Sequence, residues 1–268
     1  MEERMKSTLD TARCQVQSGA VVEAAQTCRD LLAQTPPEDV RAVALEILAA
    51  ALREQGDIAG AVDAAQAQVT LLEQLFGADH PHVAAALHNL ALLLSRRGLH
   101  PQALHCGQRE VDILRAACPA GDVRIADALV NFSSQHYVLH HFDEAESLLR
   151  EALRLYEQAQ GRRCMGVSTC LNNLGRICEN RGEMARGVAL HAEASSIRKE
   201  ILGMHKDTAF SLGNYGAALA GNEQWQEAAS VLMDAIVMYS QLDMDESPYA
   251  RACRENLDVC RRATMKPC

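Results

Sequence analysis

The feature that most constrains the fold is a sequence block that returns at a fixed step along the chain. Its copies are LEILAAALREQG at 45–56, LHNLALLLSRRG at 87–98, LVNFSSQHYVLH at 129–140, LNNLGRICENRG at 171–182 and LGNYGAALAGNE at 212–223. The first three steps are 42 residues and the last is 41, and ENLDVCRRA at 255–263 continues the register. Such repeats predict a solenoid in which each unit packs on its neighbours.

Within a repeat, apolar residues recur at helical spacing. Leu87, Leu90, Ala91 and Leu94 stand at i, i+3, i+4 and i+7, and glycine or proline interrupts the pattern afterwards. Each repeat is therefore expected to be two helices. The first helices are predicted near 3–18, 38–55, 80–97, 122–139, 164–181 and 205–222, and the second near 21–34, 58–75, 100–117, 142–158, 184–201 and 224–241.

The chain ends and connectors complete this prediction. A capping helix is expected near 246–263, followed by a flexible tail at 264–268. In the connector FGADHPHV, Asp79 is expected to cap the next helix and Pro81 to occupy its first turn. Aromatic residues make up only 4% of the chain, which favours close-packed helices over strands.

The expected fold is thus all-α, a right-handed α-solenoid of about six helix pairs plus a C-terminal capping helix. It forms a single domain over residues 1–263, and about three residues in four are expected to be helical. The six repeats are expected near 3–36, 38–77, 80–119, 122–160, 164–203 and 205–243.

Charge and cysteine content bound the function. A net charge of −9 disfavours nucleic acid and anionic membranes as partners. No apolar run reaches the roughly 20 residues that a membrane span requires, and the charged start MEERMK is unlike a secretory signal. Ten cysteines without a CxxC pair are expected to be reduced and packed. We expect a cytoplasmic protein.

The pattern Leu-x-x-Leu-(Ala/Gly)-x-x-(Leu/Tyr), followed by Gly and an aligned Ala, resembles the tetratricopeptide repeat. It is carried by LHNLALLLSRRGLHPQA and LNNLGRICENRGEMARG. The 42-residue period and the connector LEQLFGADHPHVAAALHNLA resemble the long repeats of kinesin light chains and their bacterial relatives. The connector AQGRRCMGVS departs from this form because it lacks Asp-His-Pro. The resemblance covers essentially the whole chain, and it implies that an inner wall holds peptides with an asparagine ladder.

A small residue recurs where the two helices of a repeat should approach closely. The positions are Ala49, Ala91, Ser133, Gly175 and Gly216. Two residues earlier, a polar residue recurs about 200° around the helix, so it should face the inner wall instead. These residues are Asn89, Asn131, Asn173, Asn214 and Asn256, with Ile47 as the exception.

Asparagine disfavours helix interiors, so its recurrence indicates another role. An amide can bond the backbone of an extended peptide whatever the peptide's side chains. The alternative is a structural ladder in which each Asn bonds a neighbouring helix. Flanking residues expected on this wall have mixed signs and do not predict the ligand's charge: Glu46, Arg53, His88, Arg96, Asp127, Asn172, Arg176 and Glu179.

Catalytic patterns are weak in this sequence. His136 and His140 stand at i, i+4 without a third ligand, so packing is favoured over zinc. No phosphate loop, dinucleotide fingerprint or hydrolase elbow occurs. We expect no enzyme, no metal and no cofactor.

Two functions are therefore weighed. The first is a non-enzymatic module that binds a peptide or protein segment in a concave groove. The alternative is a self-assembly scaffold that forms oligomers through its stack ends or convex face, although no residue pattern indicates a homo-oligomer.

Overall fold

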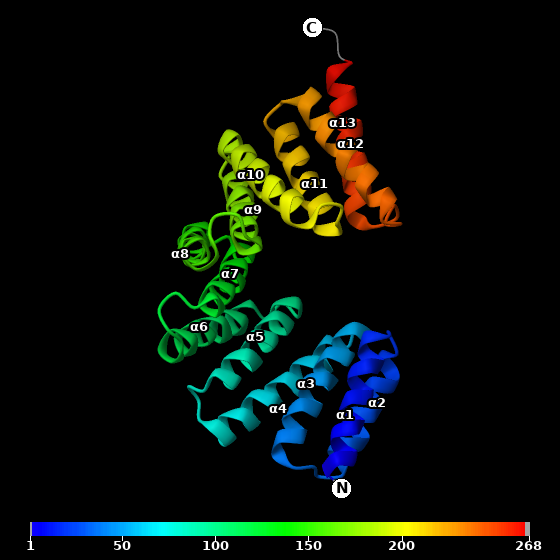
Figure 1. Cartoon of the computed structure of the whole chain (residues 1–268), viewed down its shortest axis with the longest axis vertical. Coiled ribbons are helices and arrows are strands. Elements are labelled where there is room, and N and C mark those ends of the chain that lie inside the picture. Colours follow the sequence, from blue (N-terminus) through cyan, green and yellow to red (C-terminus); the bar gives the residue numbers. More distant parts are fainter. Residues whose placement is uncertain (1, 266–268) are drawn as a thin grey trace. The chain divides into compact units, whose positions relative to one another are not determined.

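The computed structural model describes residues 2–265, and every regular element in that range is an α-helix (Figure 1). The helices are α1 (Glu2–Gln17), α2 (Val21–Ala33), α3 (Glu38–Gln55), α4 (Ile58–Phe76), α5 (Pro81–Arg96), α6 (His100–Ala117), α7 (Val123–Val138), α8 (Phe142–Gln160), α9 (Met165–Asn180), α10 (Met184–Leu202), α11 (Lys206–Gly221), α12 (Trp225–Gln241) and α13 (Pro248–Thr264). The predicted all-α solenoid of six helix pairs and a closing helix is confirmed. None of these helices combines the length and the apolar character needed to cross a bilayer.

Helix ends fall within a few residues of the predicted ones, but one cap was predicted wrongly. Pro81 is the first residue of α5 as expected, whereas the cap is His80 and not Asp79. The ring Nδ1 of His80 accepts a hydrogen bond from the backbone N–H of His82, at 3.2 Å. Because a proline at the first helical position makes the residue directly before it the cap, Asp79 stands one residue too early.

The C-terminal end also differs slightly from the prediction. Thr264 is still part of α13, one residue into the predicted tail, and residues 266–268 lie outside the described range. Helix α13 packs on α12 and α11, as expected for a helix that covers the end of the stack. Buried side chains from all three helices form the core there, among them Leu219, Leu232 and Leu257.

The chain forms two compact units. One comprises the residues up to Ala120 together with Ser134–Leu139, and the other comprises Gly121–Ser133 and the residues from His140 onward. In the first unit, α3 packs on α4, α4 on α5 and α5 on α6. In the second, α9 packs on α10, α10 on α11 and α11 on α12. Each unit therefore has the neighbour-on-neighbour packing of a repeat protein.

The apolar residues that recur at helical spacing form the surfaces through which these helices pack. Leu87, Leu90, Ala91 and Leu94 of α5 are all buried.

An ion-pair cluster joins helices in the second unit, where Glu146 of α8 bonds Arg181 at the end of α9 and Arg186 of α10. Burial alone would raise the pKa of Glu146, but hydrogen bonds from Arg150, Arg181 and Arg186 lower it to about 2.

The small residues lie where paired helices touch. A Cβ atom on Gly175 of α9 would stand 2.6 Å from the ring Nε2 of His191 in α10. A Cβ on Gly216 of α11 would stand 2.6 Å from Cγ of Leu232 in α12. Both distances are far shorter than a van der Waals contact, so no larger residue fits without rearrangement. The predicted close approach is confirmed at these two repeats.

One substitution at two sites of α11 tests this packing. Gly216→Ala should lower the free energy of unfolding by about 1–3 kcal/mol because its methyl group overlaps Leu232. Gly221→Ala in the same helix is the control, since the nearest atom there, Sδ of Met184, is 3.6 Å from the added Cβ. The control should be neutral or stabilising by up to ~1 kcal/mol. Equal urea unfolding midpoints for the two variants would contradict the assigned contact.

Candidate functional site

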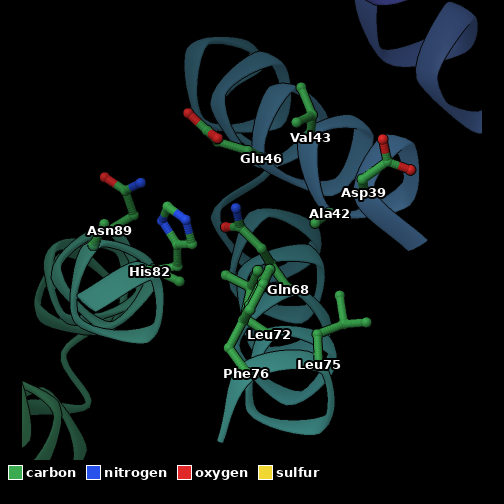
Figure 2. Close-up of a pocket in the computed structure, with 12 residues that line it drawn as sticks. Asp39, Ala42, Val43, Glu46, Gln68, Leu72, Leu75, Phe76, His82 and Asn89 are labelled. Atoms are coloured by element: carbon green, nitrogen blue, oxygen red, sulfur yellow. The ribbon is translucent and has the colours of Figure 1, made fainter. Parts of the chain in front are cut away.

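The candidate site is a cleft in the first unit between α3 and α5, with α4 as its floor. It has a main hollow of about 280 Å³ and an adjoining one of about 150 Å³. Glu46 of α3, Gln68 of α4 and Asn89 of α5 line both hollows. Figure 2 shows the side chain of Gln68 rising from α4 toward the space between the two flanking helices.

The main hollow has an apolar floor and a polar rim. Leu72 and Leu75 of α4 lie below (Figure 2), and Phe76 at the end of this helix is 49% exposed. The Phe76 ring stacks on His80 with ring centres 4.8 Å apart and meets the edge of His82 at 5.2 Å. The cleft therefore joins an apolar surface to a few polar groups, which is typical of binding sites.

Gln68 is the unusual residue of this cleft. It continues the apolar stripe formed by Ala61, Ala65 and Leu72 on α4, and only 6% of it is exposed. Within residues 2–265, its side-chain amide has no hydrogen-bond partner. Its amide atoms are not enclosed, because Gln68 lines both hollows and water in the cleft can reach them.

The next repeat handles the same position differently. Glu110 stands 42 residues after Gln68 and is also buried, but its carboxylate lies 3.1 Å from Nδ1 of His88. His88, which was predicted on the binding wall, is thus engaged inside its own repeat. The amide in α4 opens onto the cleft and bonds no other described group, while the carboxylate in α6 is paired.

In the second unit, a hydrogen bond between two side-chain amides joins neighbouring repeats. The side-chain N–H of Asn214 in α11 donates to Oδ1 of Asn172 in α9, at 2.9 Å. The same oxygen lies 3.1 Å from Nδ1 of His191. The Nε2 of His191 is 3.2 Å from Glu179 but forms no hydrogen bond with it. Asn172 is only 5% exposed, so this network is part of the packed interior.

The positions equivalent to this bonded pair lie at the cleft of the first unit. In the repeat register, Asn89 corresponds to Asn214 and Glu46 corresponds to Asn172. Both residues are exposed, and the described part of the chain contains no hydrogen bond from the Asn89 side chain. The residues at these two positions thus bond each other between α9 and α11, whereas between α3 and α5 they are exposed to solvent.

The structure distributes the other predicted wall residues between the two units. Asn131 donates to the backbone oxygen of Asp127 in its own helix, at 2.9 Å. Arg53 lines the smaller hollow and is paired with Glu54 at 2.8 Å. Arg96 and Arg176 are exposed, and Asn173 and Asn256 are half-buried. Of the ten predicted residues, the structure brings Asn89 and Arg53 together at the cleft and Asn172 and Asn214 together in the amide network.

Sequence reasoning missed Gln68, Asp39, His82 and the apolar floor. Gln68 had a signal, because a polar residue interrupts an apolar stripe in the second helix of its repeat. The others had none, since exposed polar residues on a helix are ordinary.

The described histidines and cysteines form neither a metal-binding cluster nor a disulfide. Helix α7 ends at Val138, so His136 and His140 do not share one helix face as the spacing suggested. Residues 2–265 contain no cluster of three His, Cys, Asp or Glu side chains fit for a metal ion. All nine described cysteines are free thiols and eight are buried. Burial raises the pKa of Cys28 to about 11, which makes this thiol a poor nucleophile.

Sequence models of the tetratricopeptide repeat match residues 40–116, 125–163 and 167–207. The chain belongs to the tetratricopeptide-repeat family. No curated protein matches it significantly in sequence.

Solved structures share this fold at low sequence identity. BtubC (BKLC) from P. vanneervenii is 20% identical with a TM-score of 0.69, over 89% of this chain and 92% of that one. A Podosopora anserina kinesin light chain with nearly identical TPR-like repeats is 18% identical with a TM-score of 0.66, over 76% of this chain and 99% of its own. The quorum sensor NprR from B. thuringiensis is 12% identical with a TM-score of 0.74, over 96% of this chain and 70% of that one. These likenesses establish the fold of this chain. It shares that fold with repeat proteins of the kinesin light chain type.

The amide network yields a test with a neighbouring control. Asn172→Ala should lower the free energy of unfolding by about 1–3 kcal/mol, because Asn214 and His191 both lose their partner. Asn173→Ala, at the next residue of α9, should change it by less than about 0.5 kcal/mol because no described group bonds its side chain. Chemical denaturation followed by circular dichroism measures both. A larger loss for Asn173→Ala would contradict the network.

Proposed function

We propose that this chain is a non-enzymatic protein-interaction module that binds an extended segment of a partner in the cleft between α3 and α5. The observation that carries the proposal is the amide of Gln68, which opens onto the floor of that cleft and bonds no other described group of the protein. Because only 6% of the Gln68 residue is exposed, its amide is held in place there and can bond a ligand in exchange for water.

An amide fits an extended segment because it offers both a donor and an acceptor. Each peptide unit of the ligand presents one N–H and one C=O, whatever its side chains are. Gln68 supplies one amide below the ligand and Asn89 supplies a second beside it. Main-chain hydrogen bonds would then give affinity, while the apolar floor takes one side chain of the segment.

Related folds offer a precedent for this class of ligand. A structure of NprR is in complex with its cognate peptide NprX, at 12% identity and a TM-score of 0.65, and a Rap protein is complexed with competence and sporulation factor. These statements concern those proteins. For this chain they support a peptide ligand as part of the proposal.

The asparagine row serves two purposes in this proposal. We propose as peptide contacts Asn89, Arg53 and Arg96 in the first unit and, separately, Asn173, Asn256 and Arg176 in the second. The bond between Asn214 and Asn172 favours the structural role in that repeat. Asn131 and His88 already have partners and would contact a ligand only with the atoms that remain available.

The remaining expectations from the sequence stay predictions. They are the cytoplasmic location, the absence of a cofactor and the absence of a nucleic-acid partner. No specific observation favours the self-assembly scaffold over the binding module.

Replacing the Gln68 amide tests the proposal directly. Peptides are first selected from a random display library against the full chain, and their affinities are measured by fluorescence anisotropy. Gln68→Met should weaken binding about tenfold, while the unfolding midpoint stays nearly equal because the amide bonds no other described group of the protein. Gln66→Met, at an exposed position of the same helix, is the control. The proposal fails if no peptide is enriched or if Gln68→Met binds as the wild type does.

The second amide gives an independent prediction. Asn89→Ala should weaken binding of the same peptides by about 0.5–1.5 kcal/mol, one hydrogen bond's worth. Stability should barely change, because the Asn89 amide is wetted in the free protein and alanine is the better helix former. A lowered melting temperature with retained affinity would instead assign Asn89 a structural role.

A further inference from the structure

We infer that the cleft between α3 and α5 selects a segment in which a large apolar side chain is flanked by lysine or arginine. The inference rests on the proposed function and adds the chemical class of the ligand. It is carried by the charged residues that line the main hollow, which are carboxylates without lysine or arginine. The candidate wall residues as a whole have charges of both signs.

The rim on α3 carries two carboxylates on one face of the helix. Asp39 and Glu46 are seven residues apart, two helical turns, so both point to the same side. Both are exposed, and neither forms an ion pair within the described residues. No lysine or arginine lines the main hollow. In Figure 2 the two carboxylates stand on the helix that overlooks Gln68 and the apolar floor.

The adjoining hollow does not cancel this charge. Its single basic residue, Arg53, is held by Glu54 through Nε at 3.1 Å and a terminal nitrogen at 2.8 Å. The main hollow is thus lined by two carboxylates and by no lysine or arginine. A cationic side chain is attracted to this rim and an acidic one is repelled.

The spacing of the carboxylates sets the spacing in the ligand. Seven residues of helix rise about 10 Å, and an extended chain rises about 3.3 Å per residue. A segment that runs along α3 thus passes both carboxylates within about three residues. An apolar side chain placed over Leu72 and Leu75 would have a basic residue within three positions on at least one side.

The inference is tested by repeating the peptide selection on the full chain with altered rim charges. The test variant is the double substitution Asp39→Asn, Glu46→Gln. The control is Asp63→Asn, Asp234→Asn, which changes the net charge equally at exposed carboxylates outside the cleft. Wild type and control should both enrich Lys or Arg within three residues of Leu, Phe or Met. The test variant should retain the apolar preference and lose the basic one.

One selected peptide and its Lys→Gln counterpart then complete a double-mutant cycle by fluorescence anisotropy. On wild type, the Lys→Gln change should weaken binding about three- to tenfold, since exposed ion pairs are individually modest. On the test variant, the same change should have less than a twofold effect.

The outcomes separate this inference from the proposed function. Peptides that depend on Gln68 but carry no basic enrichment, or that keep it on Asp39→Asn, Glu46→Gln, overturn the inference and leave the binding site standing. Peptides that are insensitive to Gln68→Met, or a selection without enrichment, overturn the proposed function and the inference together.

Discussion

The whole architecture depends on how closely the two helices of a repeat can approach. At Gly175 and Gly216, the absence of a Cβ admits the His191 ring and the Leu232 side chain directly onto the backbone of the first helix. These two contacts stand 41 residues apart, and the same register places a small residue in the earlier repeats, at Ala49, Ala91 and Ser133. Successive pairs can then stack, and the polar row two residues away faces out of the pair.

The stacking of helix pairs does not determine which side chains fill the space between the first helices of successive repeats. At α9 and α11, an Asn–Asn bond and a buried histidine fill that space. At α3 and α5, the equivalent positions hold Glu46 and Asn89, and a cleft remains into which the Gln68 amide opens. One repeat register thus supplies structural cohesion in one unit and an available polar surface in the other. Asparagine stands at both Asn89 and Asn214, so the residue that differs between the two sites is Glu46 in place of Asn172.

The fold could be predicted almost completely from the sequence, because it is specified by spacing. Helical periodicity fixed the stripes, and glycines and prolines fixed the turns to within a few residues. The cap at His80 was predicted wrongly because Asp79 is the better capping residue by type, whereas the position of Pro81 decides. Local geometry overrode composition at that connector.

The site was less predictable, because it depends on which polar groups find partners. Sequence alone placed Asn89 and Glu46 on a wall, but the pairing of His88 with Glu110 requires contacts between helices. Gln68 carries a sequence signal only in hindsight, since the same register holds a paired glutamate in the next repeat. Burial and partner contacts are properties of the folded chain, and no spacing rule yields them.

The measurement that tests this account most directly is hydrogen exchange of the side-chain amide protons, followed by NMR on protein labelled with 15N. The account predicts slow exchange for the side-chain N–H protons of Asn214, which donates to Asn172 across α11 and α9, and fast exchange for those of Asn89 at the rim of the cleft. Equal protection of Asn89 and Asn214 would contradict it, because the cleft would then be closed by the same amide ladder as the second unit.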